Sequence, residues 1–328
     1  MKRLLRPLCF LLCVVLLAGC TGSLSGLDQS AASFRSLLGV RGKILSHQDV
    51  CPAGNSSFDW MAMALKLSGA QDDYDGYLAA MAQSVTDRYG ENGALDAYKP
   101  TEYHRIALTV LALGGDPTAF GTDSQGNSVN LIADGTYSYD GDLGVQGLNS
   151  LIFALITLDA GAYKVPAGAA HSREEILSAI LAQQEPDGGF GLLSGSSDPD
   201  ITAMALQALA PYDEAKEAVE SALSYLSGQM TDRCTYAAYG AENAETICQV
   251  LIALYALGLD PETDPRFTRG DRTLLTGLDQ FRLSDGSYCH TEQDGKGNVI
   301  ATEQAMLALL AQQKAQNGLR LYDFTQGA

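Results

Sequence analysis

Six similar segments recur along the chain and constrain its fold more than any other feature. Each has a polar or acidic residue within its first three positions and continues as an apolar run rich in alanine and leucine. Because these runs are apolar nearly all the way round, they predict helices that are buried on both sides. The segments are FDWMAMALKLSG (58–69), TEYHRIALTVLALGG (101–115), NSLIFALITLDAG (149–161), DITAMALQALAPY (200–212), AETICQVLIALYALG (244–258) and ATEQAMLALLAQQ (301–313).

Helices of a second kind alternate with these six. Residues 172–184 and 213–229 carry apolar side chains at three- and four-residue spacing, with charged residues on the opposite face. Further candidates are residues 27–47, 72–90, 130–135 and 271–283. Six buried helices alternating with six half-exposed ones predict an all-α fold of two concentric rings, as one domain over residues 29–328.

The polar residue that starts each buried segment should face a common opening. Short connections make neighbouring helices antiparallel, so the six inner helices point the same way and their N-termini gather at one mouth. Such residues also cap helix N-termini, which is worth about 1 kcal/mol. Capping and ligand contact therefore both stay open for each starter. The starters are Asp59, Glu102, Asn149, Asp200, Glu245 and Glu303.

The N-terminus has the composition of an export signal. Lys2, Arg3 and Arg6 precede a short apolar run that ends at LAGC, residues 17–20. A basic start, an apolar run and small residues at the cleavage point are typical of a secretory signal peptide. The run is shorter than the roughly 20 apolar residues that a membrane-spanning helix needs.

The LAGC sequence resembles the bacterial lipobox, in which the cysteine receives a diacylglyceryl group before cleavage. The resemblance implies a signal peptide at residues 1–19, a lipidated Cys20 and a tether over residues 20–28. We therefore expect the protein on the extracytoplasmic face of a bacterial membrane, because two acyl chains are enough for stable anchoring. An ordinary signal peptide with an incidental cysteine is the alternative.

The chain is strongly acidic. Its formal net charge is −18, and removing residues 1–19, which carry three basic and no acidic side chains, takes it to −21. An acidic surface repels nucleic acid, so we expect no nucleic-acid partner. Among the cysteines after Cys20 there is no C-x-x-C spacing, and a Cys234–Cys248 disulfide or free buried thiols both stay open. The other two are Cys51 and Cys289.

Two glycine-containing motifs suggest a family. AILAQQEPDGGFG (179–191) resembles the Q-x-x-D-G-G-[WF]-G repeat of squalene cyclases and protein prenyltransferase β subunits, and LDQFRLSDGSY (278–288) is similar to a reduced second copy. The resemblance covers about residues 30–320. It implies the α6/α6 toroid of the terpenoid cyclase and protein prenyltransferase superfamily, which agrees with the two rings expected from the repeat.

One branch of this superfamily suggests a catalytic acid. Class II terpene cyclases protonate an alkene with the middle aspartate of D-x-D-D-T-A, and residues 198–203 here read DPDITA. The resemblance implies that Asp200 would be the proton donor if the protein is an enzyme. Ile201 replaces the following aspartate, and the chain has one tryptophan and 8% aromatic residues with which to stabilise carbocations.

Two other branches imply different sites. Protein prenyltransferases bind zinc through Asp, Cys and His, and the nearest match is Glu245, Cys248 and His290, with a different first spacing; a core cysteine and a turn histidine are the alternative. Intrinsic factor and transcobalamin bind cobalamin without chemistry, and residues 200–206, DITAMAL, are similar to a pattern on their inner helices. Their second, β-rich domain has no counterpart here, so a partner protein could cover the mouth.

These observations favour a lipid-anchored capture protein for a corrinoid or another small organic ligand, bound at the mouth of the toroid. An isoprenoid enzyme, either a terpene cyclase or a prenyltransferase-like protein, is the first alternative, and a surface interaction scaffold is the second. The residues expected to contact the ligand are Trp60, Glu102, Tyr103, His104, Gln146, Asn149, Asp198, Asp200, Thr202, Asn243, Glu245 and Glu303.

Overall fold

The computed structural model describes residues 21–238 and 240–325. The expected signal peptide and Cys20 lie outside these ranges. No helix within them is long and apolar enough to span a membrane. Among the described residues, the regular secondary structure is almost entirely α-helical, with two small antiparallel hairpins. Their strands are β1 (Ala237–Ala238), β2 (Ala241–Glu242), β3 (Thr268–Arg269) and β4 (Arg272–Thr273).

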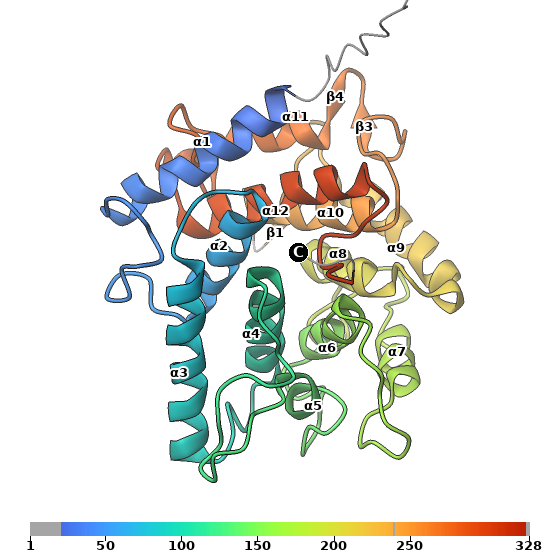
Figure 1. Ribbon diagram of the computed structural model, residues 1–328. Helices are drawn as coiled ribbons and strands as arrows, with labels where there is room; N and C mark the ends of the chain where they lie inside the picture. The colour runs from blue at the N-terminus through green and yellow to red at the C-terminus, as the bar shows by residue number, and fades with distance from the viewer. Residues whose placement is uncertain (1–20, 239, 326–328) are drawn as a thin grey trace, which may run out of the picture.

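Six helices surround the centre of the molecule and coincide with the six repeated segments (Figure 1). Each of them contacts the next one along the chain, and α12 contacts α2. The inner helices are α2 (Ser56–Leu67), α4 (Pro100–Leu113), α6 (Leu148–Ala160), α8 (Pro199–Leu209), α10 (Ala244–Ala256) and α12 (Val299–Ala315).

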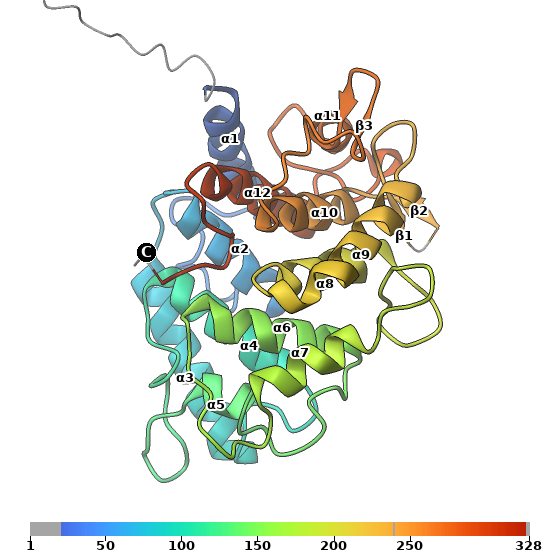
Figure 2. The same ribbon diagram turned by 90° about the vertical axis from the view of Figure 1, so that its right-hand side faces the viewer.

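Six further helices lie outside this ring, as Figures 1 and 2 show. They bury one face only; α3, for example, buries Tyr77, Met81, Val85 and Tyr89, which recur every four residues. The outer helices are α1 (Thr21–Leu38), α3 (Tyr74–Asn92), α5 (Leu131–Gly135), α7 (Arg173–Leu181), α9 (Lys216–Gln229) and α11 (Leu274–Leu278). Short 3₁₀ turns cover Asp213–Ala215, Asp279–Phe281 and Glu292–Asp294.

The first outer helix differs from its expected position. It begins at Thr21, so the part of residues 20–28 that the structure describes is helical, although it was expected to be a tether. Leu27 is buried, which explains why this segment packs against the domain. The helix ends at Leu38, well before residue 47, because Gly39 adopts a positive φ of 67°.

The inner helices begin at dedicated cap residues that precede the acidic starters. The side chains of Asn55, Asp198, Asn243 and Asn298 each accept a hydrogen bond from a backbone N–H in the first turn of the helix that follows. Asp198, for instance, accepts from the amides of Asp200 and Ile201. Capping by these residues leaves the starter side chains free for other contacts.

The D-G-G-F motif is a structural clip between α7 and α8. Asp187 accepts hydrogen bonds from the Gly189 amide at 3.0 Å and from a nearby serine hydroxyl, which fixes the turn. The turn delivers Phe190 into the core, where it is fully buried. The Thr202 hydroxyl then accepts from the Phe190 amide at 2.8 Å and joins the turn to the inner helix.

The second copy of the motif repeats this arrangement before α12. Asp285 accepts from the amide and the hydroxyl of Ser287, and the Tyr288 amide donates to the Thr302 hydroxyl at 2.9 Å. Tyr288 is buried as Phe190 is. The repeat therefore explains why Thr202, which was expected to contact a ligand, is instead buried and bonded within the fold.

After α12 the chain turns back across the ring. We refer to residues 319–325 as the C-terminal segment. The Lys314 ammonium donates to the carbonyls of Leu321 and Asp323 at 2.9 and 3.0 Å, and the Phe324 amide donates to the carbonyl of Ala160, the last residue of α6. Figure 1 shows this red segment in the middle of the ring. It therefore covers the end at which the inner helices finish.

Candidate functional site

A cavity of about 310 Å³ lies inside the ring and is lined by all six inner helices and the C-terminal segment. Ser56, Thr101 and Asn149 belong to the first turns of α2, α4 and α6, so the cavity lies toward the start of these helices. We call this end the mouth. The lining residues are Ser56, Trp60, Thr101, Glu102, Arg105, Asn149, Phe153, Met204, Gln249, Gln304 and Tyr322.

The starting turns of the other three inner helices meet at the same end. Burial is the main cause of the raised pKa of Asp200 on α8 and of Glu303 on α12, and the charge of Glu245 on α10 adds to both, so these three carboxyl groups lie near one another. Because Asp200 precedes Met204, and Glu245 precedes Gln249, by four residues, each lies on the cavity-facing side of its helix, one turn nearer the mouth.

The inward side chains therefore form two layers, which are four residues apart along α2, α4, α6, α8 and α10. Sequence reasoning found three of the five first-layer residues but only Trp60 of the second layer. Counting four residues on from Asn149, Asp200 and Glu245 would have found Phe153, Met204 and Gln249, whereas no such count leads to Arg105 or Gln304. The first layer contains Ser56, Thr101, Asn149, Asp200 and Glu245. The second contains Trp60, Arg105, Phe153, Met204, Gln249 and Gln304.

Asp200 is a partly protonated acid at mildly acidic pH. Burial, and then the neighbouring carboxylates of Asp198 and Glu245, raise its pKa to about 6, while Thr246 and His290 act in the opposite direction. Its Oδ1 atom is buried without a hydrogen-bond partner. Since Asp198 already caps α8, the carboxyl group of Asp200 remains available to an incoming group.

Glu245 and His290 form a pair beside Asp200. The Nδ1 atom of His290 lies 2.8 Å from a carboxylate oxygen of Glu245, and burial raises the pKa of Glu245. Cys248, the third residue of the zinc hypothesis, is a buried thiol whose pKa burial raises well above its ordinary value. No three His, Cys, Asp or Glu side chains are placed to share a metal ion within residues 21–238 and 240–325.

A chain of amide hydrogen bonds crosses the cavity wall from α8 to α12. The side-chain NH₂ of Gln207 donates to Gln249 at 2.8 Å, Gln249 donates to Gln304 at 2.6 Å, and Gln304 donates to Glu303 at 2.8 Å. Burial raises the pKa of Glu303, and its second oxygen has no partner. The chain fixes the orientation of the two amides that face the cavity.

On the opposite wall, Arg105 reaches the cavity with its charge already paired. Its guanidinium donates to Asp59 at 2.9 Å and to both oxygens of Glu102, and Tyr77 donates to Asp59 at 2.8 Å. Gly54 adds a carbonyl contact at 2.8 Å. This network explains why Glu102 and Asp59 lie at the mouth, and it makes their first role structural.

Three aromatic rings form one side of the cavity. The ring centroid of Trp60 lies 5.9 Å from that of Phe153 and 6.2 Å from that of Tyr322, both in tilted arrangements. Such rings present the negative faces of their π-systems to a guest. The chain is therefore poor in aromatic residues as a whole, but three of them cluster at this cavity.

Two expected ligand contacts lie away from the cavity. Tyr103 is buried and accepts from the amides of Leu95 and Asp96, and His104 bonds through Nε2 to the carbonyl of Gly135 in α5 at 2.6 Å. Both face outward because they follow the inward-facing Thr101 and Glu102 around α4. Burial lowers the pKa of His104 to about 4, so it is a neutral structural residue.

Three more expected contacts are occupied by the fold. Gln146 accepts from the amide and the hydroxyl of Thr101, which ties the start of α4 to the segment before α6. Asn243 caps α10 through the Thr246 amide at 2.9 Å, as Asp198 caps α8. All four remaining cysteines are free and buried, so the Cys234–Cys248 disulfide is absent.

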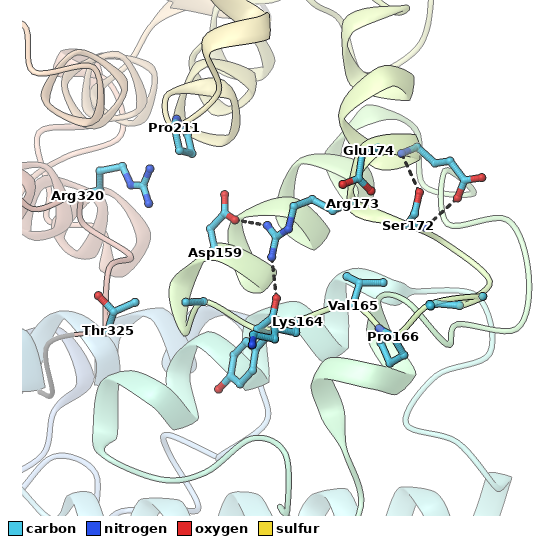
Figure 3. Close-up of a pocket in the computed structure, with 16 residues that line it drawn as sticks. Asp159, Lys164, Val165, Pro166, Ser172, Arg173, Glu174, Pro211, Arg320 and Thr325 are labelled. Carbon is cyan, nitrogen blue, oxygen red and sulfur yellow. Dashed lines mark hydrogen bonds and ion pairs between the residues drawn. The ribbon is translucent and has the colours of Figure 1, made fainter.

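The molecule also has a larger pocket, of about 890 Å³, at the other end of the ring. Figure 3 shows Arg320 and Thr325 of the C-terminal segment on one side and residues 164–166 on the other. Asp159 and Arg173 form an ion pair within it, and Arg173 also donates to the carbonyl of Tyr163. Asp159 and Arg173 therefore satisfy each other's charge.

Exposed apolar side chains gather around the mouth. In the part of the chain that the structure describes, five large apolar residues are exposed, and each precedes or begins an inner helix. Leu192, for example, accepts a backbone hydrogen bond from Leu148 at the start of α6. We call these residues the apolar rim: Tyr98, Val145, Leu192, Leu193 and Ile300.

The fold and the cavity define an α/α toroid with a central cavity, and comparison with solved structures agrees with this fold. Protein geranylgeranyltransferase-I from Candida albicans, solved with GGPP, matches with a TM-score of 0.58 and 11% identity, over 86% of this chain and 90% of that chain. A type II terpene cyclase from Scytonema matches with a TM-score of 0.50 and 12% identity, over 88% and 98% of the two chains.

The fold also occurs with other chemistry. Unsaturated glucuronyl hydrolase from Bacillus sp. GL1 matches with a TM-score of 0.56 and 11% identity, over 89% of this chain and 96% of that one. Because identities this low establish the fold alone, the reaction has to be argued from the residues of the site.

A curated relative carries the sequence-level similarity. Drimenyl diphosphate synthase from Streptomyces showdoensis is 27% identical over 142 residues, which cover 42% of this chain and 26% of the relative. No protein-family model matches the chain. With the structural matches, this similarity confirms the resemblance to the toroid superfamily of terpenoid cyclases and protein prenyltransferases.

Proposed function

We propose that this protein is an isoprenoid enzyme that starts a cyclisation by protonating a carbon–carbon double bond, with Asp200 as the acid. One observation carries the proposal. Asp200 occupies the middle position of the D-x-D-D-T-A-like segment and lies one turn above a cavity with three aromatic rings, with a buried, unpartnered oxygen.

The environment of Asp200 suits a general acid. A carboxyl group must be neutral to donate a proton, and burial with two nearby carboxylates raises the pKa of Asp200 to about 6. Ile201 replaces the acidic neighbour of the cyclase motif. Glu245 on α10, whose charge adds to the raised pKa of Asp200, supplies a second carboxyl group in its place.

The reaction needs no cofactor to balance. The π electrons of the terminal double bond form a C–H bond with the acid proton of Asp200 and leave a carbocation on the more substituted carbon. A second double bond attacks this cation and closes a ring. Transfer of a proton from an adjacent carbon to water then completes an isomerisation, and solvent returns a proton to the Asp200 carboxylate. Trp60 and Phe153 stabilise the intermediate positive charge through their ring faces.

The cavity and its surroundings support an apolar guest of modest size. Its volume of about 310 Å³ lies at the lower end of the range for small-molecule sites, roughly 300–1,000 Å³. The apolar rim gives such a guest an apolar approach in an otherwise acidic protein. A corrinoid is far larger than this cavity, and the comparisons favour the isoprenoid enzyme over corrinoid capture.

The chain matches only part of drimenyl diphosphate synthase, so the substrate has to be tested directly. Geranyl, farnesyl and geranylgeranyl diphosphate and squalene are incubated with the pure protein, and cyclic products are identified by gas chromatography and mass spectrometry. We expect a product from at least one substrate, and its formation falls about 10²- to 10⁴-fold in Asp200→Asn.

Asp213→Asn provides the matched control, because Asp213 is an acidic residue near a helix start whose side chain is 90% exposed. It should retain wild-type activity. Equal losses in both variants, or full activity in Asp200→Asn, would contradict the assignment of the acid. Failure of all four substrates with folded wild-type protein would contradict the enzyme class.

A further inference from the structure

We infer that Tyr322 is the floor of the cavity and sets the length of the guest that the toroid accepts. The identification of that guest as an isoprenoid rests on the proposed function. The floor itself rests on the geometry of the C-terminal segment, which brings a residue from the last part of the described chain into the centre of the ring (Figure 1).

Tyr322 belongs to the linings of two cavities. One is the cavity at the mouth, and the other is a space of about 20 Å³ whose lining includes Ile156, Gln207 and Ile252. On α6, α8 and α10, these residues lie three positions after residues that line the cavity at the mouth, namely Phe153, Met204 and Gln249. The small space therefore continues the bore about one helical turn deeper.

The ring of Tyr322 is positioned to close this passage. It contacts Trp60 in the upper cavity, with 6.2 Å between centroids. Below it, Pro211 and Ala256 mark the ends of α8 and α10 in the lining of the smaller space. A guest that enters from the mouth would therefore meet the phenol ring before it reached the far end of the bore.

The backbone on both sides of Tyr322 is held independently of its side chain. The Lys314 ammonium binds the carbonyls of Leu321 and Asp323, which flank Tyr322, and its ammonium group also lies 4.6 Å from the ring centroid of Phe324. The Phe324 amide binds α6. Replacing the Tyr322 ring should thus leave the segment in place and join the two spaces.

The chain contains a built-in reporter for this test. Trp60 is the only tryptophan, it lines the cavity, and it touches Tyr322. Its fluorescence is titrated with geraniol, farnesol and geranylgeraniol, and in parallel with decanol, tetradecanol and octadecanol. The linear alcohols probe depth without requiring isoprenoid recognition.

In the wild type we expect affinity to stop rising, or to fall, at the longer members of each series. Tyr322→Ala should increase the affinity for the longest alcohol about tenfold or more relative to the shortest, because additional methylene groups are buried. Tyr322→Phe should keep the wild-type order. Adding Ile252→Phe to Tyr322→Ala should remove the gain by refilling the deeper space.

An unchanged length preference in folded Tyr322→Ala would overturn the inference, as would the absence of any response of Trp60 to both series. If Tyr322→Ala does not fold, Tyr322→Leu takes its place, with a smaller shift expected in the same direction. Repeating the titrations in Asp200→Asn separates the two claims, because loss of catalysis there leaves the length preference intact if the floor is correctly assigned.

Discussion

Asp198 and Asp200 stand two residues apart and have different physical roles. One oxygen of Asp198 accepts the backbone N–H groups of Asp200 and Ile201, so its charge is used by the helix. Asp200 keeps an oxygen without a partner and a raised pKa. The sequence predicted that both residues lie at a helix start beside the mouth. Which of the two carboxyl groups caps the helix depends on the backbone geometry, and the sequence alone does not specify that geometry.

This division of roles predicts that substitutions of Asp198 and of Asp200 differ in their effect on the free energy of unfolding. Asp198→Ala should lower the free energy of unfolding by about 1 kcal/mol, because two first-turn amides lose their acceptor. Asp198→Asn, which can still cap, should retain most of the stability. Asp200→Asn should leave stability nearly unchanged at pH 4. Urea denaturation checks the series, and a larger loss in Asp200→Asn than in Asp198→Ala at that pH would contradict it.

The raised pKa of Asp200 gives both activity and stability a defined dependence on pH. Activity that needs the neutral acid should fall as pH rises through about 6. The folded state binds the proton more tightly than the unfolded state, whose ordinary pKa is 3.8, so the stabilisation is complete below that value and is lost as pH rises to about 6. Between pH 4 and pH 7, the free energy of unfolding of the wild type should therefore fall by roughly 1–3 kcal/mol more than that of Asp200→Asn. A flat difference between wild type and variant would contradict the assignment.

At the scale of elements, the helices of both rings were predictable, but the ends of some outer helices were not. An inner helix is buried on both sides, so its apolar composition is read directly from the sequence. The helix α11 is much shorter than the expected range 271–283, and its five residues are too few to show a helical period. The start of α1 was missed because its first residues resemble a flexible linker in composition.

The chain of amide hydrogen bonds through Gln249 joins separate helices, so no local sequence pattern predicts it. Gln249 accepts from Gln207 and donates to Gln304, which links α8, α10 and α12. Gln249→Leu should lower the free energy of unfolding by about 1–3 kcal/mol, because two partly buried amides lose a partner. Gln125→Leu, at an exposed loop position, is the control and should change little. Equal stability of the two variants by urea denaturation would rule out a structural role for the chain.

At the scale of the whole molecule, the two-ring architecture followed from the repeat, and the family followed from two short motifs. The depth of the bore did not, because it depends on the C-terminal segment, whose sequence LRLYDFT (319–325) has no periodic pattern. The signal peptide, lipidated Cys20 and extracytoplasmic location stay predictions from the N-terminal sequence. Corrinoid capture also stays a prediction.

The most direct measurement is the isotopic composition of the product formed in heavy water. A cyclisation that starts with transfer of the Asp200 proton, which exchanges with solvent, should place a single deuterium on the carbon that is protonated first. Mass spectrometry would show this as a product heavier by one mass unit than the product formed in ordinary water. A cyclic product of unchanged mass would mean that ring closure begins without protonation, and would contradict the role given to Asp200.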